Sequence, residues 1–591
     1  MKTILEKISE IVSRGFADAG YDAAYGKAGL SNRPDLCEFQ CNGAMAGAKA
    51  YHKAPMAIAT DVASKLEGDP AFSKIEAVAP GFLNINVSDD FLAEYLNKMS
   101  SEERFGTDVK ESERIIVDYG GPNVAKPLHV GHLRAAIIGE SVKRICRFMG
   151  NEVIGDVHLG DWGLQMGLII TELKCRKPDL PYFDESFTGD YPKEPPFTLS
   201  ELEEIYPCAS AKSKEDEAYK EAALEATKRL QNGNRGYHAL WEHIMNVSVP
   251  DLKKNYKDLS VEFDWWKGES SVEDIVPGMV DDMKKAGLAH ESEGALVVDV
   301  AKEDDTKEIP PCMILKSDGA ALYTTTDLAT LVDRKKSFDP AHVIYVVDKR
   351  QEMHFVQVFR CAHKTGIVGK DVKLDFLGFG TMNGKDGKPF KTREGGVMRL
   401  ETLIADIRET MYKKIMDNHE ADPDEARQTA NTVALAAIKY GDLSNQATKD
   451  YVFDTDKFTS FEGNTGPYIL YTIVRIKSIL SKYMDEKGIA VEDRLPGDIK
   501  DAQNGFEKAL MLELTKFSST VISAYEEIAP HRICAYIYDV CNAFNRFYHE
   551  TRILTEEDAE KKDGWIALLV LTKRILECCI DLLGFEAPEK M

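Results

Sequence analysis

Long hydrophobic runs are absent from this sequence of 591 residues. No uninterrupted apolar segment approaches the ~18 residues that a membrane-spanning helix needs. The first residues, Met1-Lys2-Thr3, lead into an amphipathic pattern that includes Glu6 and Glu10, and not into the apolar segment of a secretory signal. We therefore expect a protein that stays in the cytoplasm and has no membrane partner.

Cysteine pairs with metal-site spacing are also missing. The eleven cysteines include no Cys-x-x-Cys motif, and the closest regular spacing, Cys37 and Cys41, has no matching second pair. This usage predicts reduced core cysteines, without disulfide bonds and without a structural zinc site.

Positively charged residues are fewer than negatively charged ones. The 74 Lys and Arg residues are outnumbered by 98 Asp and Glu residues, which gives a formal net charge of -24. This balance argues against indiscriminate binding of nucleic acid. It still allows a large polyanion to bind on local basic surfaces, because the electric field is local whereas net charge is a sum.

One stretch has the pattern of a strand, a loop and a helix. Residues 115–119 form a short apolar, β-branched run closed by Gly120-Gly121-Pro122, as expected for a buried parallel strand that ends in a loop. A helix is predicted to follow, because apolar residues recur with helical spacing up to Gly150, which supplies a left-handed stop. The residues with this spacing are Leu133, Ile137, Val142, Ile145 and Met149.

Two histidines, His129 and His132, lie at the predicted helix start with Gly131 between them. A helix start offers unpaired N–H groups and a positive dipole end, which suit a polyphosphate, and a glycine lets a nucleotide approach the backbone. The imidazoles can donate hydrogen bonds to phosphate oxygens as charge develops, and Lys126 adds a cation. A histidine pair at a solvated helix end is the alternative. Zinc is disfavoured, since no third ligand lies nearby with metal-site spacing.

Two further polar groups follow predicted secondary elements. Residues 322–327 run into a helix that would place Tyr323 and Asp327 one turn apart, although Asp327 could equally be a carboxylate on a helix surface. The apolar run 343–347 predicts a buried strand, which ends in Asp348-Lys349-Arg350-Gln351. Side chains at such ends can point into a cleft.

Residues 383–396 predict a flexible, positively charged loop in an otherwise acidic protein. The loop contains four glycines, and its only acidic residues are Asp386 and Glu394. Its cations are Lys385, Lys388, Lys391 and Arg393. Flexibility with positive charge suits a lid that closes over a triphosphate and steadies the leaving pyrophosphate. A solvated basic hairpin is the alternative.

The order of predicted elements indicates an α/β fold with a Rossmann-type parallel-sheet catalytic core. The core is expected over residues 106–405, after an α+β N-terminal module (1–105) and before an all-α C-terminal helical domain (406–591) without strands. Six of the 23 prolines lie between Lys177 and Pro207. They interrupt regular structure, so residues 178 to about 290 are interpreted as an insertion that splits the core.

The C-terminal domain carries aromatic and basic residues that could stack on exposed nucleotides, although most aromatic residues at helical spacing belong to a core. Residues 506–525 are predicted to form one of its helices. The candidate contact residues are Tyr468, Tyr471, Arg475, Tyr536, Tyr538, Arg546, Tyr548 and Arg552.

These motifs resemble those of a known family. Residues 122–132, Pro-Asn-Val-Ala-Lys-Pro-Leu-His-Val-Gly-His, resemble the first signature of class I aminoacyl-tRNA synthetases, in the form used by arginyl-tRNA synthetases. Residues 388–392, Lys-Pro-Phe-Lys-Thr, resemble the second signature, which is usually Lys-Met-Ser-Lys-Ser. The resemblance extends over nearly the whole chain, through residues 38–43, 159–163, 323–327, 463–468 and 582–584.

The resemblance implies activation of arginine with ATP to arginyl-adenylate, release of pyrophosphate, and transfer of arginine to the 2′-hydroxyl of the terminal adenosine of tRNA(Arg). Carried over by position, His129 and His132 would bind ATP and act at its α-phosphate. Lys391 would hold the β- and γ-phosphates, and Lys126 would share its work. The ATP site would also include Gly131 and Lys388. Mg²⁺ would accompany ATP.

The resemblance also implies binding sites for arginine and tRNA. The arginine pocket would be formed by Asp118, Asn123, Tyr323, Asp327 and Gln351. Relatives often carry glutamate where this chain has Asp118, whose reach is shorter. The N-terminal module would bind the tRNA elbow, the helical domain would bind the anticodon, and the insertion would lie near the acceptor end. A monomer is the expected assembly state.

Three functions compete at this point: an arginyl-tRNA synthetase, another nucleotidyl-transfer enzyme such as a cytidylyltransferase, and a non-catalytic RNA-binding relative. The large helical domain disfavours the second, which needs no anticodon reader. The intact His129, His132, Lys391 and Asp327 disfavour the third. Lysine is the nearest competing amino acid, but Tyr323 with Gln351 favours the broader guanidinium.

Overall fold

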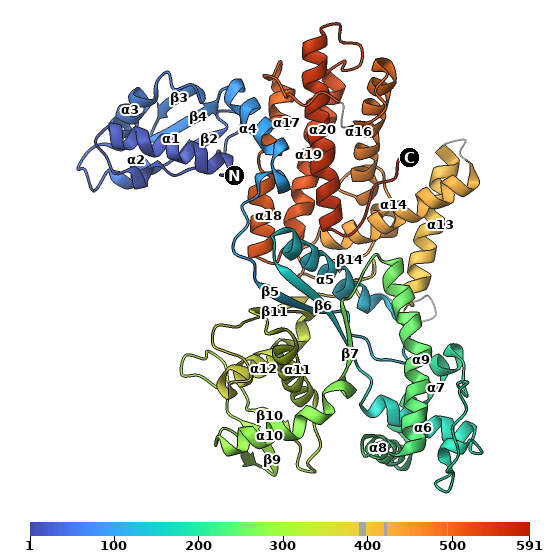
Figure 1. Cartoon of the computed structure of the whole chain (residues 1–591). Coiled ribbons are helices and arrows are strands. Elements are labelled where there is room, and N and C mark those ends of the chain that lie inside the picture. The colour runs from blue at the N-terminus through green and yellow to red at the C-terminus, as the bar shows by residue number, and fades with distance from the viewer. Residues whose placement is uncertain (389–397, 419–421, 493–494) are drawn as a thin grey trace. The chain divides into compact units, whose positions relative to one another are not determined.

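The computed structural model describes residues 1–388, 398–418, 422–492 and 495–591. The chain forms two compact units, which Figure 1 colours by residue number. One unit contains Met1–Lys110, Ser460–Leu582 and Glu586–Met591, and the other contains Glu111–Thr459 and Leu583–Phe585. Residues 406–459, placed in the helical domain by the sequence analysis, pack in the second unit with the parallel sheet.

The second unit is built on a five-stranded parallel sheet in the order β12-β11-β5-β6-β7, counted over the residues that the structure describes. The apolar residues of β5 and β11 are buried, as expected for strands covered on both faces. The strands are β5 (Arg114–Tyr119), β6 (Glu152–Leu159), β7 (Trp265–Gly268), β11 (His342–Asp348) and β12 (Lys373–Phe379).

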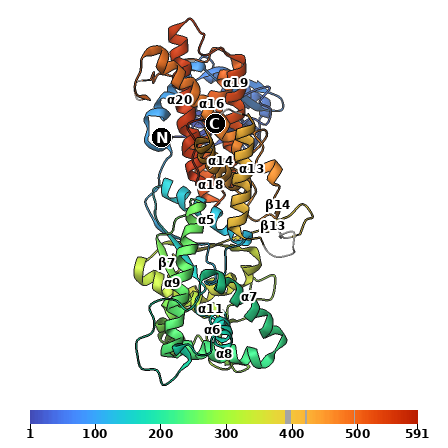
Figure 2. The same cartoon turned by 90° about the vertical axis from the view of Figure 1, so that its right-hand side faces the viewer.

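Helices and short strands surround this sheet. The first helix after β5 is α5 (Val130–Phe148), which confirms the predicted strand, loop and helix. α6 lies directly before the predicted insertion and packs against α7 and α8, which lie within it (Figure 2). The other helices are α6 (Leu164–Arg176), α7 (Leu199–Glu215), α8 (Glu217–Gln231), α9 (Arg235–Asp258), α10 (Val276–Lys285), α11 (Tyr323–Phe338), α12 (Glu352–Thr365), α13 (Leu400–Asn418), α14 (Pro423–Leu443) and α15 (Thr455–Phe458). Short 3-10 turns are η3 (Pro181–Phe183), η4 (Glu269–Ile275) and η5 (Lys349–Gln351).

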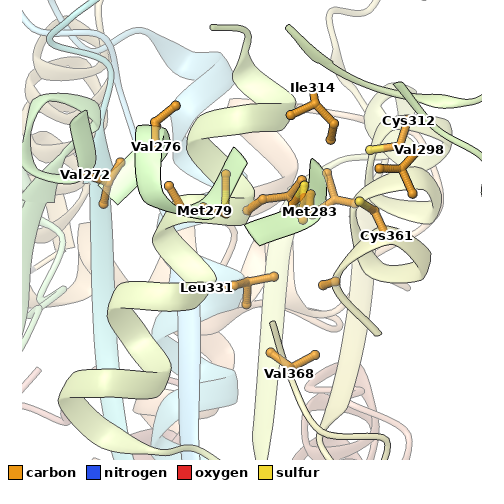
Figure 3. Close-up of a cluster of buried hydrophobic side chains, with 14 of the residues drawn as sticks. Val272, Val276, Met279, Met283, Val298, Cys312, Ile314, Leu331, Cys361 and Val368 are labelled. Atoms are coloured by element: carbon orange, nitrogen blue, oxygen red, sulfur yellow. The ribbon is translucent and has the colours of Figure 1, made fainter. Parts of the chain in front are cut away.

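A hydrophobic core joins α10, α11 and α12 to a small antiparallel sheet of β8 (His290–Ser292), β9 (Ala295–Val298) and β10 (Cys312–Leu315). Figure 3 shows part of this core, where Met279 and Met283 of α10 lie among side chains from β9, β10, α11 and α12. The core therefore holds α11 and α12 in place. α11 carries Tyr323 and Asp327, and Gln351 directly precedes α12.

The first unit combines an α+β module with a helical bundle. The module has an antiparallel sheet in the order β1-β2-β4-β3. Its Asn97, on α4, exchanges two hydrogen bonds of 2.8 Å with the backbone of Ile499, in the segment before the bundle helix α17. Its elements are α1 (Ile4–Asp18), η1 (Ala23–Gly26), β1 (Ala28–Leu30), β2 (Phe39–Cys41), α2 (Gly43–Gly47), α3 (Pro55–Leu66), β3 (Phe72–Val78), β4 (Phe82–Val87), α4 (Asp89–Ser101) and η2 (Glu103–Gly106). In the bundle, α16, α19 and α20 run alongside one another (Figures 1 and 2). The bundle helices are α16 (Gly466–Lys487), α17 (Gly505–Leu514), α18 (Phe517–Glu526), α19 (His531–Glu550) and α20 (Ala559–Leu582).

Three details differ from the sequence-based expectations. Residues 506–525 form two helices, α17 and α18, because the chain bends after Thr515, whose hydroxyl donates back to the carbonyl of Leu512. A short strand, β14 (Tyr451–Val452), pairs with β13 (Met382–Asn383), so strands do occur after residue 405. Tyr536 is only 5% exposed and belongs to the bundle core, not to a nucleotide-binding surface.

Candidate active site

The predicted functional residues follow two adjacent strands of the parallel sheet. β5 pairs with β11, and the chain leaves these strands in opposite directions along the sheet, first to β6 and later to β12. Ligands bind at such a switch point, outside the carboxyl ends of the strands. The histidine loop follows β5, and Gln351 follows β11.

The loop between β5 and α5 is held by backbone contacts to neighbouring elements. The N–H of Val124 donates to the carbonyl of Gly160 (3.0 Å), and the N–H of Ala125, which has a left-handed φ of 61°, donates to Oγ of Ser248 (3.1 Å). A Cβ on Gly160 would lie 2.1 Å from Oδ1 of Asn123. The exposed Asn123 therefore packs closely over Gly160, and a larger residue there would displace its side-chain amide.

The two histidines cap the first turn of α5. Nδ1 of His129 accepts from the N–H of Gly131 (3.0 Å), and Nδ1 of His132 accepts from the N–H of His129 (3.1 Å). The ring centroids lie 3.9 Å apart. A Cβ on Gly131 would lie 2.7 Å from Cε1 of His129, so glycine lets the first ring fold back onto the helix start.

Burial sets the charge of both rings, and the capping hydrogen bonds set which nitrogen carries the proton. Burial and the charge of Lys126 lower the pKa of His129, and burial with the charges of His129 and Lys126 lowers the pKa of His132 to about 3. Both imidazoles are thus neutral at pH 7. Because Nδ1 of each accepts a hydrogen bond, the proton is on Nε2. Each ring therefore presents one N–H donor without carrying a positive charge.

The three predicted lysines differ in their surroundings. Lys126 is partly buried, and its Nζ lies 5.2 Å from the ring centroid of Tyr206 on α7. Lys388 is exposed in the loop after β13. Lys391 lies outside the described residues. Lys385, in the same predicted loop, forms ion pairs with Asp454 (3.1 Å) and Asp456 (3.2 Å).

Tyr323 and Asp327 lie one turn apart at the start of α11, as the sequence predicts. Tyr323 is 65% exposed and is open to a ligand. Oδ2 of Asp327 lies 2.5 Å from Nε2 of His354 in the first turn of α12. Gln351 is exposed and directly precedes α12, so the Asp327–His354 contact brings α11 next to the end of β11.

An acidic residue that sequence reasoning missed, Glu269, lies close to Asp327. Burial, together with the nearby charges of Asp161 and Asp327, raises the pKa of Glu269 to about 8. Asp161 itself accepts hydrogen bonds from the N–H and the hydroxyl of Ser270. Burial and these neighbouring charges favour the protonated form of Glu269, whereas a bound cation would favour its carboxylate. No periodic pattern identifies Glu269, because it lies in an irregular turn of the insertion.

Asp118 pairs with a buried arginine that the sequence also gave no sign of. Arg334 of α11 is 0% exposed, and it donates to the carboxylates of Asp118 and Asp156 and to the hydroxyl of Tyr345 (3.0 Å). These partners come from β6, β5 and β11. Arg334 therefore fixes α11 over the middle of the sheet, and Asp118 is part of that anchor.

Comparisons with known proteins identify the family of this chain. Residues 95–455 match the family described as tRNA synthetases class I (R), catalytic domain, residues 2–87 match the arginyl tRNA synthetase N terminal domain, and residues 469–591 match the DALR anticodon binding domain. The arginine–tRNA ligase of Agathobacter rectalis is 66% identical, and that of Alkaliphilus oremlandii is 57% identical, each with 100% of both chains covered. The chain belongs to the arginyl-tRNA synthetase family.

Solved structures of this family share the fold. The arginyl-tRNA synthetase of Plasmodium falciparum is 26% identical with a TM-score of 0.81, and that of Thermus thermophilus is 21% identical with a TM-score of 0.77. Both comparisons cover 100% of each chain.

As an arginyl-tRNA synthetase, the protein uses ATP to activate arginine and joins it to tRNA(Arg). The site described above therefore lies in a catalytic domain with a class I parallel sheet. Among the residues that the structure describes, no helix has the length and apolar character needed to cross a membrane.

Proposed function

We propose that His129 and His132 bind the α-phosphate of ATP through their Nε2–H groups during adenylate formation. The observation that carries this proposal is the double cap, which uses both Nδ1 atoms and leaves both Nε2–H donors available. Neutral donors suit a phosphate whose charge increases in the transition state, because they need no counter-ion when the site is empty. The nearby N–H groups at the start of α5 add to the positive electrostatic potential at the phosphate.

Lys126, Lys388 and Lys391 supply the positive charge for the triphosphate in this proposal. Lys126 approaches from the histidine loop, and Lys388 and Lys391 approach from the loop after β13. Mg²⁺ accompanies ATP. Asp118 and Asp156, on β5 and β6, are already paired with Arg334, so the phosphates supply the hard oxygen ligands of the ion in this proposal.

Arginine is proposed to bind between α11 and the end of β11. Asp327 and Glu269 receive the guanidinium, since two carboxylates can accept its planar, parallel N–H groups. The exposed ring of Tyr323 covers the aliphatic part, and Asn123 and Gln351 bind the polar end of the amino acid. Asp118 contributes to the pocket through its pair with Arg334 and not as a direct ligand.

The tRNA is proposed to bind across several parts of the chain, with arginine transferred to its terminal 2′-hydroxyl. The N-terminal module receives the elbow and the insertion lies near the acceptor end. On the helical bundle, the guanidinium of Arg475 lies 4.8 Å from the ring centroid of Tyr471 and 5.2 Å from that of Tyr548. Such an aromatic and cationic surface suits stacking of anticodon bases. The enzyme is proposed to act as a cytoplasmic monomer.

Pyrophosphate exchange with a panel of amino acids tests this function. We expect exchange of labelled pyrophosphate into ATP only with arginine, and only when tRNA(Arg) is present. Lysine serves as the matched control, because it has the same charge without the planar guanidinium. Exchange driven by lysine would refute the assigned pocket.

The affinity for arginine is expected to depend on pH through Glu269. Its pKa of about 8 means that the free enzyme holds a proton there at neutral pH. A bound guanidinium favours the carboxylate, so binding releases this proton and the affinity rises with pH by as much as about tenfold per unit, levelling off above the pKa. Calorimetric titration with arginine between pH 6.5 and 9 measures this affinity. Glu269→Gln should bind weakly without this rise, and a flat wild-type profile would contradict the role of Glu269.

A further inference from the structure

Arg134 is a buried cation that has no part in the site described so far. It lies on α5, two residues after His132, and is 2% exposed. Its Nε donates to Oδ1 of Asp442 on α14 (2.8 Å). Its Nη1 donates to the carbonyl oxygens of Gly380 (2.7 Å) and Lys449 (3.0 Å). One guanidinium thus joins the helix of the histidines to three other segments of the same unit.

Two of these segments form the root of the loop that carries Lys388. Gly380 follows β12, Lys449 precedes β14, and the N–H of Gly380 donates to the carbonyl of Ala447 (2.9 Å). A Cβ on Gly380 would lie 2.5 Å from the carbonyl atoms of Lys449, so the two backbones touch. The guanidinium also lies 5.0 Å from the ring centroid of Tyr451, whose N–H donates to Thr381 (3.1 Å). The loop root is therefore a packed, hydrogen-bonded structure whose two backbones are both bound by Arg134.

The orientation of the guanidinium indicates what it is for. An arginine that only neutralised Asp442 would make two parallel hydrogen bonds to that carboxylate. Arg134 instead makes one bond to Asp442 and two to backbone carbonyls, and its buried Nη2 has no hydrogen-bond partner among the described residues. A buried unpaired donor costs free energy. The contacts to Gly380 and Lys449 therefore set the position of the side chain.

We propose that Arg134 is a positioning residue for adenylate formation, which fixes the distance between the helix start bearing His132 and the root of the loop bearing Lys388. This inference rests on the proposed roles of those two residues at the phosphates of ATP. The planar guanidinium of Arg134 thus connects the two sides of the nucleotide site. A displacement of about 1 Å between reacting groups can cost about 100-fold in rate.

Arg134→Lys tests the proposal, because lysine keeps the charge opposite Asp442 but cannot hold both carbonyls in the same planar geometry. In pyrophosphate exchange with tRNA(Arg), we expect kcat to fall about 100-fold while the KM for arginine stays within about twofold. Arg144→Lys is the matched control on the same helix. Its Nε pairs with Glu140 (2.8 Å), away from the loop root, and its kcat should stay within about twofold of wild type.

A second variant separates positioning from stability. Asp442→Asn keeps the carbonyl contacts of Arg134, so it should lower the melting temperature while kcat stays within about threefold. If Arg134→Lys does not fold, a loss of kcat of about 100-fold in Asp442→Asn would overturn the proposal, because the salt bridge would then be what matters. A folded Arg134→Lys variant with unchanged kcat would also overturn the proposal. So would a variant that loses affinity equally for arginine and for ATP. Exchange by the wild type with arginine, run alongside, tests the function itself separately.

Discussion

Replacing His132 with alanine is expected to lower kcat for arginyl-adenylate formation about 100- to 1000-fold. The variant loses the Nε2–H that is proposed to bind the α-phosphate as its charge grows. Because this contact belongs to the transition state, the affinity for tRNA should stay within about twofold. Single-turnover adenylate formation and a tRNA filter-binding assay measure the two quantities. Equal losses in both would remove the role in the transition state.

His132→Asn separates chemistry from helix capping. The asparagine oxygen can still accept from the N–H of His129, as Nδ1 does now at 3.1 Å, but no donor reaches the position of Nε2. We therefore expect the stability of wild type with the slow chemistry of the alanine variant. The rate of the wild-type enzyme should show no inflection near pH 6.5 from His132, since burial and neighbouring charges lower the pKa of His132 to about 3. Wild-type rates in His132→Asn would contradict this account.

Asp327→Asn is expected to raise the KM for arginine about 100-fold, which corresponds to about 2.7 kcal/mol of lost binding. The substitution keeps the shape of the side chain but removes the charge that pairs with the guanidinium. The KM for ATP should stay within about threefold, since the histidine loop is held by contacts of its own. Steady-state exchange kinetics with each substrate varied in turn measure both constants.

His354→Ala is the matched control for this prediction. It removes the 2.5 Å partner of Asp327 but leaves the carboxylate in place, so the KM for arginine should change by less than about tenfold. A larger effect for His354→Ala than for Asp327→Asn would mean that the pair supports the helix and does not bind the substrate.

Much of the fold could be predicted because its signals are local. The β-branched run of β5, the glycines after it and the helical spacing of α5 each lie within one short stretch, and the structure has all three. The same holds for β11 and for Tyr323 and Asp327 at the start of α11. Period and turn chemistry are enough to place such residues at the ends of elements.

The buried charge pairs could not be predicted, since each joins residues far apart in the sequence. Arg334 is 178 residues from Asp156, and Arg134 is 308 residues from Asp442. An arginine in a helical pattern reads as a solvated side chain unless its partner is known. The break between α17 and α18 was missed for a related reason, because neither Gly nor Pro marks it.

A crystal structure with a non-hydrolysable arginyl-adenylate analogue tests the central claim most directly. The account predicts the phosphate oxygens within hydrogen-bonding distance of Nε2 of His129 and His132, both Nδ1 caps intact, and the guanidinium between Asp327 and Glu269. A phosphate bound away from both rings, or imidazoles turned so that Nδ1 faces the ligand, would contradict it.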